Sequence, residues 1–192
     1  MRKYVTLAVL VVGLPACSLL GTDCGRNRPD TYYDVQGIGF SVARQPRDKS
    51  WEFAAAGNTV PSRELRLRLT LKERHYTVVP VAGLLPAAYA CDPVPAGSLG
   101  STEQMDSLSI TSDYDFDALH PAGTQLADLL LVDERYSLLV PSRQMPLEPF
   151  RFVELSLREA PATTGPQKFR VYYRQTNGEI YTAETVAITL AQ

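Results

Sequence analysis

The sequence predicts a mainly β protein, an antiparallel β-sandwich with one short helix, for which an immunoglobulin-like arrangement is one candidate. Several segments alternate apolar and polar residues, which is the pattern of strands with one buried face. Prolines lie at the joints between these segments. The pair Asn177-Gly178, the strongest short hairpin signal, separates two of them. An immunoglobulin-like domain built from this sequence would lack the Cys–Trp–Cys core, because Trp51 precedes Cys91.

The first two strands are predicted from their alternation. The segment from Tyr32 to Val42 changes parity at Gly37, so we expect a bulge or bend there. The segment from Arg63 to Lys72 alternates strictly and predicts a strand with one buried face. We interpret its polar face, which carries Arg66 and Arg68, as a solvated sheet face rather than a ligand-binding ladder. Its apolar face consists of four leucines, Leu65, Leu67, Leu69 and Leu71.

The middle of the chain is predicted to hold two loops, a short strand and the helix. Residues 43–62 and 82–105 contain many turn formers and are predicted as loops. Alternation over residues 108–110 marks a short strand. Residues 125–132 predict the helix, because leucines follow a candidate N-cap, Thr124, at helical spacing. These leucines are Leu126, Leu129 and Leu130.

The last third of the chain is rich in strand patterns. Residues 150–157, 169–174 and 180–190 are predicted as strands, the last two joined by the hairpin. In the second of these strands Tyr173 faces inward, so Tyr172 faces outward and is a candidate contact residue for a partner. The return strand is expected to point Val186, Ile188 and Leu190 into the core.

The N-terminus has the pattern of an export signal. Arg2 and Lys3 precede an apolar run of ten residues, from Val5 to Leu14, which is too short to span a bilayer. Leu14-Pro15-Ala16-Cys17 follows and resembles the lipobox of bacterial lipoproteins. The resemblance implies cleavage before Cys17 and a lipid on its thiol. The expected organisation is a signal peptide at 1–16, a lipidated tether at 17–30 and one β-rich domain at 31–192.

The other two cysteines are expected to pair. With Cys17 acylated, Cys24 and Cys91 remain, and an exported protein matures in an oxidising compartment. A bridge between them would close a loop of about 67 residues and stabilise the fold by roughly 4 kcal/mol. The alternative is two unpaired thiols, with Cys24 in the tether.

Three aspartates form the one candidate metal site. Asp113, Asp115 and Asp117 occupy alternate positions, as carboxylates do at the start of a calcium loop. The rest of that loop pattern is missing, because Ala118 stands where glycine is needed and Thr124 where a bidentate glutamate is needed. We therefore favour a polar turn and keep a Ca²⁺ site as the alternative.

Charge and motifs exclude several functions. Lys and Arg number 19 against 21 Asp and Glu, and loss of Arg2 and Lys3 with the signal leaves 17 against 21, a net charge of −4. There is no basic cluster with interleaved aromatic residues, so no nucleic-acid partner is expected. The sequence contains two histidines, His75 and His120, and no nucleophile elbow, P-loop or dinucleotide fingerprint. We assign no catalytic residues and no cofactor.

Four segments together resemble a family of uncharacterised lipoproteins from Bacteroidota. They are YYDVQGI, YACDPVPAGSLGS, SLSITSDYDFD with HPAGTQL, and KFRVYYRQTNGEIY. The resemblance implies an exported lipoprotein with a β-rich domain, and it implies no catalytic residues. One acidic residue follows the lipobox in SLLGTDCG, so we expect an outer-membrane protein that faces the periplasm, with exposure at the cell surface as the alternative.

The sequence thus favours a non-catalytic binding or assembly module, held at the membrane by its N-terminal lipid. An envelope protein or a glycan is the candidate partner. The first alternative is a lipoprotein that binds a divalent cation or a carbohydrate through Asp113–Asp117 and the loop at 82–105. The second alternative is a hydrolase that carries none of the motifs above.

Overall fold

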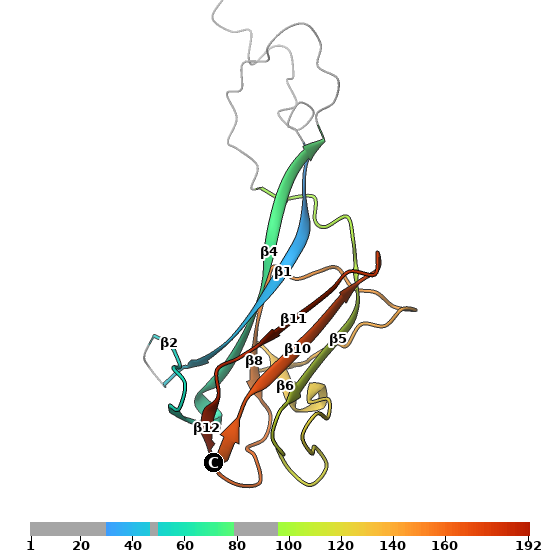
Figure 1. Cartoon of the computed structure of the whole chain (residues 1–192). Helices are drawn as coiled ribbons and strands as arrows, with labels where there is room; N and C mark the ends of the chain where they lie inside the picture. The colour runs from blue at the N-terminus through green and yellow to red at the C-terminus, as the bar shows by residue number, and fades with distance from the viewer. Residues whose placement is uncertain (1–29, 47–49, 79–95) are drawn as a thin grey trace, which may run out of the picture.

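The computed structural model describes residues 30–46, 50–78 and 96–192, and its regular secondary structure is almost entirely β-strand (Figure 1). A six-stranded sheet has the order β2-β1-β4-β8-β6-β7, and two three-stranded sheets have the orders β11-β10-β5 and β3-β12-β9. The prediction of a mainly β, antiparallel fold is confirmed. The signal segment, Cys17, Cys24 and Cys91 lie outside the described residues.

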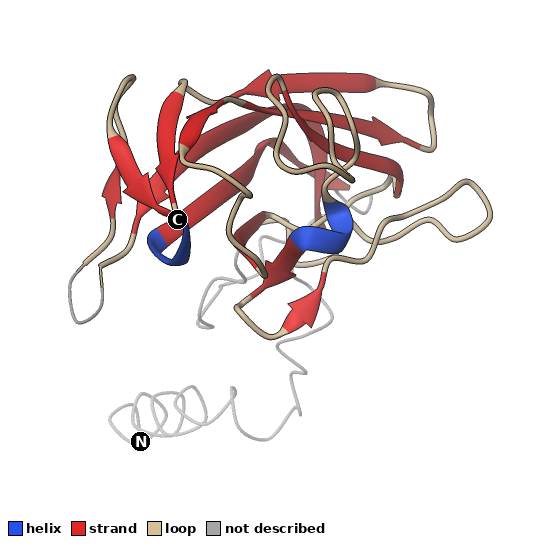
Figure 2. Ribbon diagram, turned by 90° about the horizontal axis from the view of Figure 1, so that it is seen from below, coloured by secondary structure: helices blue, strands red, loops and turns tan. Residues whose placement is uncertain are grey.

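The strands and the two single-turn 3-10 helices have the following bounds. The six-stranded sheet contains β1 (Asp30–Arg44), β2 (Glu52–Phe53), β4 (Leu65–Val78), β6 (Leu130–Val132), β7 (Tyr136–Ser137) and β8 (Phe152–Leu157). The other sheets contain β5 (Met105–Ser112), β10 (Phe169–Gln175) and β11 (Ile180–Glu184), and β3 (Thr59–Pro61), β9 (Gly165–Gln167) and β12 (Ile188–Ala191). The helical turns are η1 (Ser62–Glu64) and η2 (Ala127–Leu129), drawn in blue in Figure 2.

The core forms because β4 and β10 each turn one apolar face inward. Leu65, Leu67 and Leu69 of β4 are fully buried, as the strict alternation predicts. Full burial of each leucine side chain stabilises the fold by about 2 kcal/mol. Phe169, Val171 and Tyr173 of β10 lie in the same cluster of buried residues, so the sheets share one core.

Strands β1 and β4 pair over their whole length and form a ribbon that extends beyond the body (Figure 1). The register runs from Asp30 opposite Val78 to Arg44 opposite Leu65, with one shift between Val35 and Gly37. The predicted irregularity is therefore a bulge, and Gln36 is its extra residue. The bulge restores the burial of alternate residues after the change of parity in the sequence.

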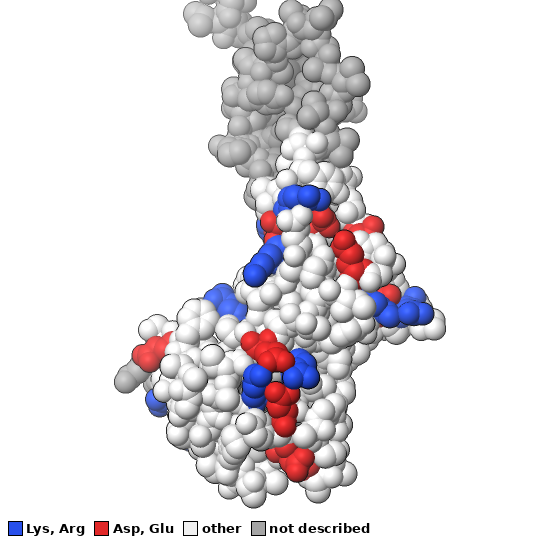
Figure 3. All heavy atoms as spheres, in the orientation of Figure 1, with Lys and Arg blue, Asp and Glu red and all other residues white. Residues whose placement is uncertain are grey.

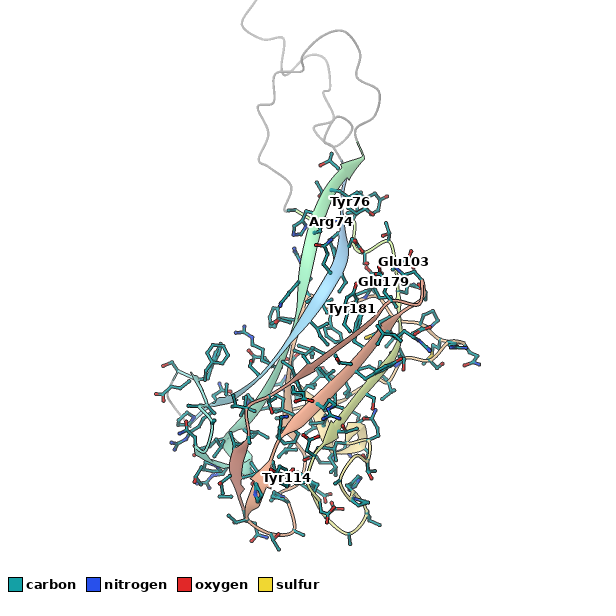
Figure 4. The ribbon with its side chains drawn as sticks, viewed as in Figure 1. Arg74, Tyr76, Glu103, Tyr114, Glu179 and Tyr181 are labelled. Atoms are coloured by element: carbon teal, nitrogen blue, oxygen red, sulfur yellow. The ribbon has the colours of Figure 1, made fainter. Side chains whose placement is uncertain are left out.

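Hydrogen bonds fasten this ribbon to the body. The Tyr181 hydroxyl of β11 lies 2.7 Å from the Val35 carbonyl oxygen at the bulge and 3.0 Å from a Glu179 carboxylate oxygen (Figure 4). Burial, reinforced by the hydrogen bond to Glu179, raises the pKa of Tyr181 to about 12, so the hydroxyl keeps its proton. The Tyr33 hydroxyl of β1 also donates to the Pro149 carbonyl at 2.8 Å.

The predicted helix at 125–132 is wrong beyond a single turn. Residues 127–129 form the 3-10 helix η2, and residues 130–132 continue as strand β6. Thr124 is not the N-cap, because η2 begins after Leu126, which makes no side-chain capping bond. Leu130 is buried and pairs with Leu157 of β8, so sheet pairing outweighs the helical spacing of the leucines.

Two other segments also differ from the prediction. Residues 43–62 are not only loop, since they contain β2 and β3. The return strand at 180–190 breaks into β11 and β12, which belong to different sheets. At the break, the Thr185 hydroxyl accepts a hydrogen bond from the Phe169 amide, and Val186 is 42% exposed instead of facing the core. Ile188 and Leu190 are buried, as predicted.

Substitution of Tyr181 by Phe tests the attachment of the ribbon. Loss of the hydroxyl removes the bond to the bulge, and we expect it to lower the free energy of unfolding in urea by about 1 kcal/mol. Amide hydrogens of residues 31–35 should exchange faster with deuterium in this variant. Tyr114→Phe is the matched control, because no protein group accepts from the exposed Tyr114 hydroxyl in the described structure. Equal effects of the two substitutions would contradict this account.

Candidate functional site

The outer face of β4 is not the solvated surface that the sequence predicts. Arg66 and Arg68 point away from the leucine face, yet their side chains are only 13% and 27% exposed. Neighbouring strands and the turn after β6 cover them. The interpretation of a solvated sheet face is therefore wrong at these two positions.

A pocket of about 180 Å³ lies over Arg66. The Arg66 guanidinium donates through Nε to Gln45 Oε1 at 2.9 Å and through Nη1 to the Leu65 carbonyl at 2.9 Å, and its Nη2 contacts the Glu134 carboxylate. Burial lowers the pKa of Arg66, and the charge of Glu154 opposes that shift. The pocket is lined by Gln45, Arg66, Asp133, Glu134, Glu154 and Ser156.

Ser156 is the unusual residue of this pocket. It lies on β8, opposite Leu131 of β6, and is 6% exposed. No protein group in the described structure makes a hydrogen bond with its hydroxyl. Buried polar groups are normally paired, and an unpaired one costs roughly 1–3 kcal/mol. Ser156 therefore lines the pocket and carries an enclosed donor and acceptor that no described residue uses.

The turn between β6 and β7 supplies the acidic wall of the pocket. Asp133 and Glu134 both adopt left-handed backbone conformations, with φ of 51° and 60°. This region is costly for residues other than glycine, by roughly 1–2 kcal/mol each. Backbone strain of this kind is found at functional sites. Its effect here is to hold two carboxylates beside Arg66.

Aromatic residues continue the same face of the sheet. Trp51 precedes β2 and Phe152 begins β8, and the Arg68 guanidinium lies 4.5 Å and 5.4 Å from their ring centroids. Phe53 packs edge-on against Trp51 at 5.1 Å. Phe53 and Phe152 are 63% and 58% exposed, which is unusual for large apolar side chains so close together.

Glu154 joins the pocket to the aromatic residues. Its carboxylate lines the pocket and lies 3.6 Å from Arg68 Nε, a buried donor with no hydrogen-bond partner in the described structure. We call the six pocket residues together with Trp51, Phe53, Arg68 and Phe152 the outer-face site. It combines hydrogen-bond donors, carboxylate acceptors and exposed aromatic rings, which are the groups that bind ligands. Its serine, Ser156, has no hydrogen-bonded base among the described residues that would activate it as a nucleophile.

The structure does not bring the three predicted metal ligands together. Asp113 faces basic residues of β10 and its approach, with Arg170 at 3.2 Å and Lys168 at 3.5 Å. Acidic and basic side chains lie close together on the face of the body drawn in Figure 3. Asp115 accepts from the Ala122 amide at 2.7 Å, and Asp117 serves the turn described next. Among the described residues, no group of three or more His, Cys, Asp or Glu is placed to hold a metal ion.

Asp117 instead forms a bridge with the second histidine. His120 is 8% exposed, and its ring nitrogens lie 2.8 Å from Asp117 and 3.0 Å from Asp128. Burial lowers the pKa of His120, but hydrogen bonds and charge from the two carboxylates outweigh it, so the pKa is raised. The bridge ties the turn after β5 to η2, a structural role that the sequence did not reveal.

Tyr172 and the remaining predicted residues add little to the site. Tyr172 lies on β10 opposite Ser109 and Thr182 and is half-buried, on a different sheet from the outer-face site. The predicted lipidation residue and both predicted disulfide residues fall outside the described part of the chain. Of the outer-face residues, the sequence drew attention to Arg66 and Arg68 alone, and their face was interpreted as solvated rather than as a ligand-binding ladder.

Comparisons with protein-family models, with curated proteins and with solved structures find no match for this chain. The lipoprotein resemblance and the immunoglobulin-like arrangement therefore stay predictions. In the described part of the structure, no helix has the length and apolar character needed to cross a membrane.

The His120 bridge predicts a pH dependence of stability. A pKa raised in the folded state means that the protonated histidine stabilises the fold below its ordinary pKa of 6.5, and that this contribution is lost as pH rises through the raised value. We expect the difference in unfolding free energy between wild type and His120→Gln to be largest near ~pH 6 and to shrink toward ~pH 9. Urea titrations at each pH measure it, with His75→Gln as the substitution that leaves the bridge intact. A difference that grows with pH would contradict the assignment.

Proposed function

We propose that this chain is a lipid-anchored, non-catalytic binding module of the cell envelope, and that it binds its ligand at the outer-face site. One observation supports the proposal of ligand binding at this site: the buried Ser156 hydroxyl lacks a partner among the described residues, in a polar pocket that adjoins exposed aromatic rings. A ligand hydroxyl would satisfy Ser156 and cover the rings. Such a site serves recognition without any chemical step.

The proposed anchor agrees with the direction of the ribbon. Cys17 precedes Asp30 by thirteen positions, and Asp30 lies at the tip of the β1–β4 ribbon (Figure 1). Ser41, the partner of Arg68, follows Asp30 by eleven positions along β1, or roughly 35 Å at the rise of a strand. The ribbon would therefore hold the outer-face site away from the lipid surface. We place the protein on the outer membrane, facing the periplasm.

The proposed disulfide also agrees with the ribbon. Cys24 precedes Asp30 by six positions, and Cys91 precedes Ala96 by five. The chain after Ala96 returns to the same end of the ribbon, where the Leu99 amide donates to the Thr31 carbonyl at 3.0 Å. An extended chain covers up to about 3.5 Å per residue, so these chain lengths would allow the proposed pair to form. Their bridge would tie the ribbon tip to the segment beside it.

The anchor is tested by membrane partition. Wild type expressed from its full gene should sediment with the membrane fraction and enter the detergent phase in a Triton X-114 separation. Cys17→Ala should lose the lipid and move to the soluble fraction, because acyl chains supply roughly 0.8 kcal/mol of binding per buried CH₂. Cys24→Ala is the matched control and should stay with the membrane. Equal partition of wild type and Cys17→Ala would overturn the anchor.

The disulfide is tested by mass spectrometry of the mature protein without reduction. We expect a linked pair of peptides that contain Cys24 and Cys91, and no alkylation of either residue before reduction. Reduction should lower the free energy of unfolding by roughly 4 kcal/mol, because it releases a long loop in the unfolded chain. Two thiols that react with iodoacetamide in the native protein would contradict the pairing.

A further inference from the structure

The lining of the pocket favours polar ligands and disfavours anions. All six lining side chains are polar, so most of the surface that an acyl chain would meet is polar. Three of them are carboxylates, and the one guanidinium, that of Arg66, already donates to Gln45 and Leu65 and contacts Glu134. An anion would therefore meet net negative charge and few free donors.

The polar groups of the outer-face site that lack hydrogen-bond partners favour a ligand that both donates and accepts hydrogen bonds. Asp133 makes no ion pair or hydrogen bond through its carboxylate with the described residues, so it offers acceptors. Arg68 Nε lies 3.6 Å from the Glu154 carboxylate without a hydrogen bond, and the Ser156 hydroxyl, which can donate and accept, has no partner among the described residues. Neighbouring hydroxyl groups on one ligand match this mixture, because each hydroxyl donates once and accepts.

The exposed aromatic residues of the site favour a ligand with an apolar face. Phe152 and Phe53 expose their rings beside the pocket, and aromatic faces carry a negative quadrupole that attracts positively polarised C–H groups. A lysine side chain would fit less well, since Arg68 already places a cation over Trp51 and Phe152. A second cation would lie near a like charge.

We propose that the outer-face site binds a neutral oligosaccharide, with one sugar ring in the pocket and the next ring against Phe152. A pyranose ring joins hydroxyl groups around its edge to an apolar face, which is the combination that the site requires. The pocket, at about 180 Å³, has the size of a single such ring. This inference rests on the proposed function, because it names the ligand class of the same site.

The experiment uses Trp51, the single tryptophan of the chain, as the reporter. The full chain in detergent is titrated with cellohexaose, maltohexaose, mannohexaose and chitohexaose, and tryptophan fluorescence is recorded. At least one of these should change the fluorescence with saturation. Hexalysine serves as the cationic comparison, and a saturable response to hexalysine alone would overturn the proposal.

Two variants locate the binding. Ser156→Ala should weaken the saccharide roughly ten-fold or more, because the buried hydrogen bond is lost. It should be at least as stable as wild type in urea, since it removes a buried hydroxyl that no described protein group pairs with. Phe152→Ala should weaken binding to a similar degree. Tyr114→Ala, an exposed aromatic residue after β5 at the end of the body away from the ribbon, is the control and should bind normally (Figure 4).

The outcomes separate this inference from the function on which it rests. If none of the four oligosaccharides saturates, or if Ser156→Ala binds them as wild type does, the saccharide proposal is overturned. Membrane partition of wild type and Cys17→Ala is unaffected by either result. A chain that partitions as proposed but binds no oligosaccharide keeps its anchor and loses this ligand class.

Discussion

The pairing of β1 with β4 is the constraint on which the rest of the structure depends. It holds β4 in one register, with the leucines on the core side and Arg66 and Arg68 on the other. A slip of one residue would exchange the two faces and bury the arginines in the core. The bulge at Gln36 keeps Val35 and Ile38 on the buried side despite the change of parity. The same pairing thus fixes the core, the ribbon and the floor of the outer-face site.

The parts of the fold that follow from local patterning could be predicted from the sequence. Burial of one face imposes a period of two, so β4 and the bulge in β1 were evident from hydrophobic spacing alone. Other parts depend on distant partners. The leucines at 126–130 suit a helix or a strand, and pairing with β8 decides for the strand at Leu130. The break at Thr185 could not be foreseen, because it follows from a bond to Phe169 on another strand.

The outer-face site could not be predicted from the sequence because its residues come from five separate segments. Trp51 and Arg68, for example, meet only because β2 and β4 lie on either side of β1. The alternation of β4 was interpreted as one buried face and one solvent-exposed face. The pattern could not reveal that other elements cover the face predicted to be exposed. For the aspartates from 113 to 117, the sequence suggested a shared site that the structure does not form. Their spacing suggested a common cation, but Arg170, Lys168 and His120 supply the opposite charges.

A single measurement tests the central claim, that the covered polar face of β4 is a binding site. The isotopically labelled full chain in detergent is titrated with the hexasaccharides, and chemical shifts of assigned amide and indole groups are mapped by NMR. The account predicts that shifts concentrate at the Trp51 indole, at Asp133 and Glu134, and on β8 around Ser156. Shifts confined to β10 and β11, or no shifts with any of the sugars, would contradict it.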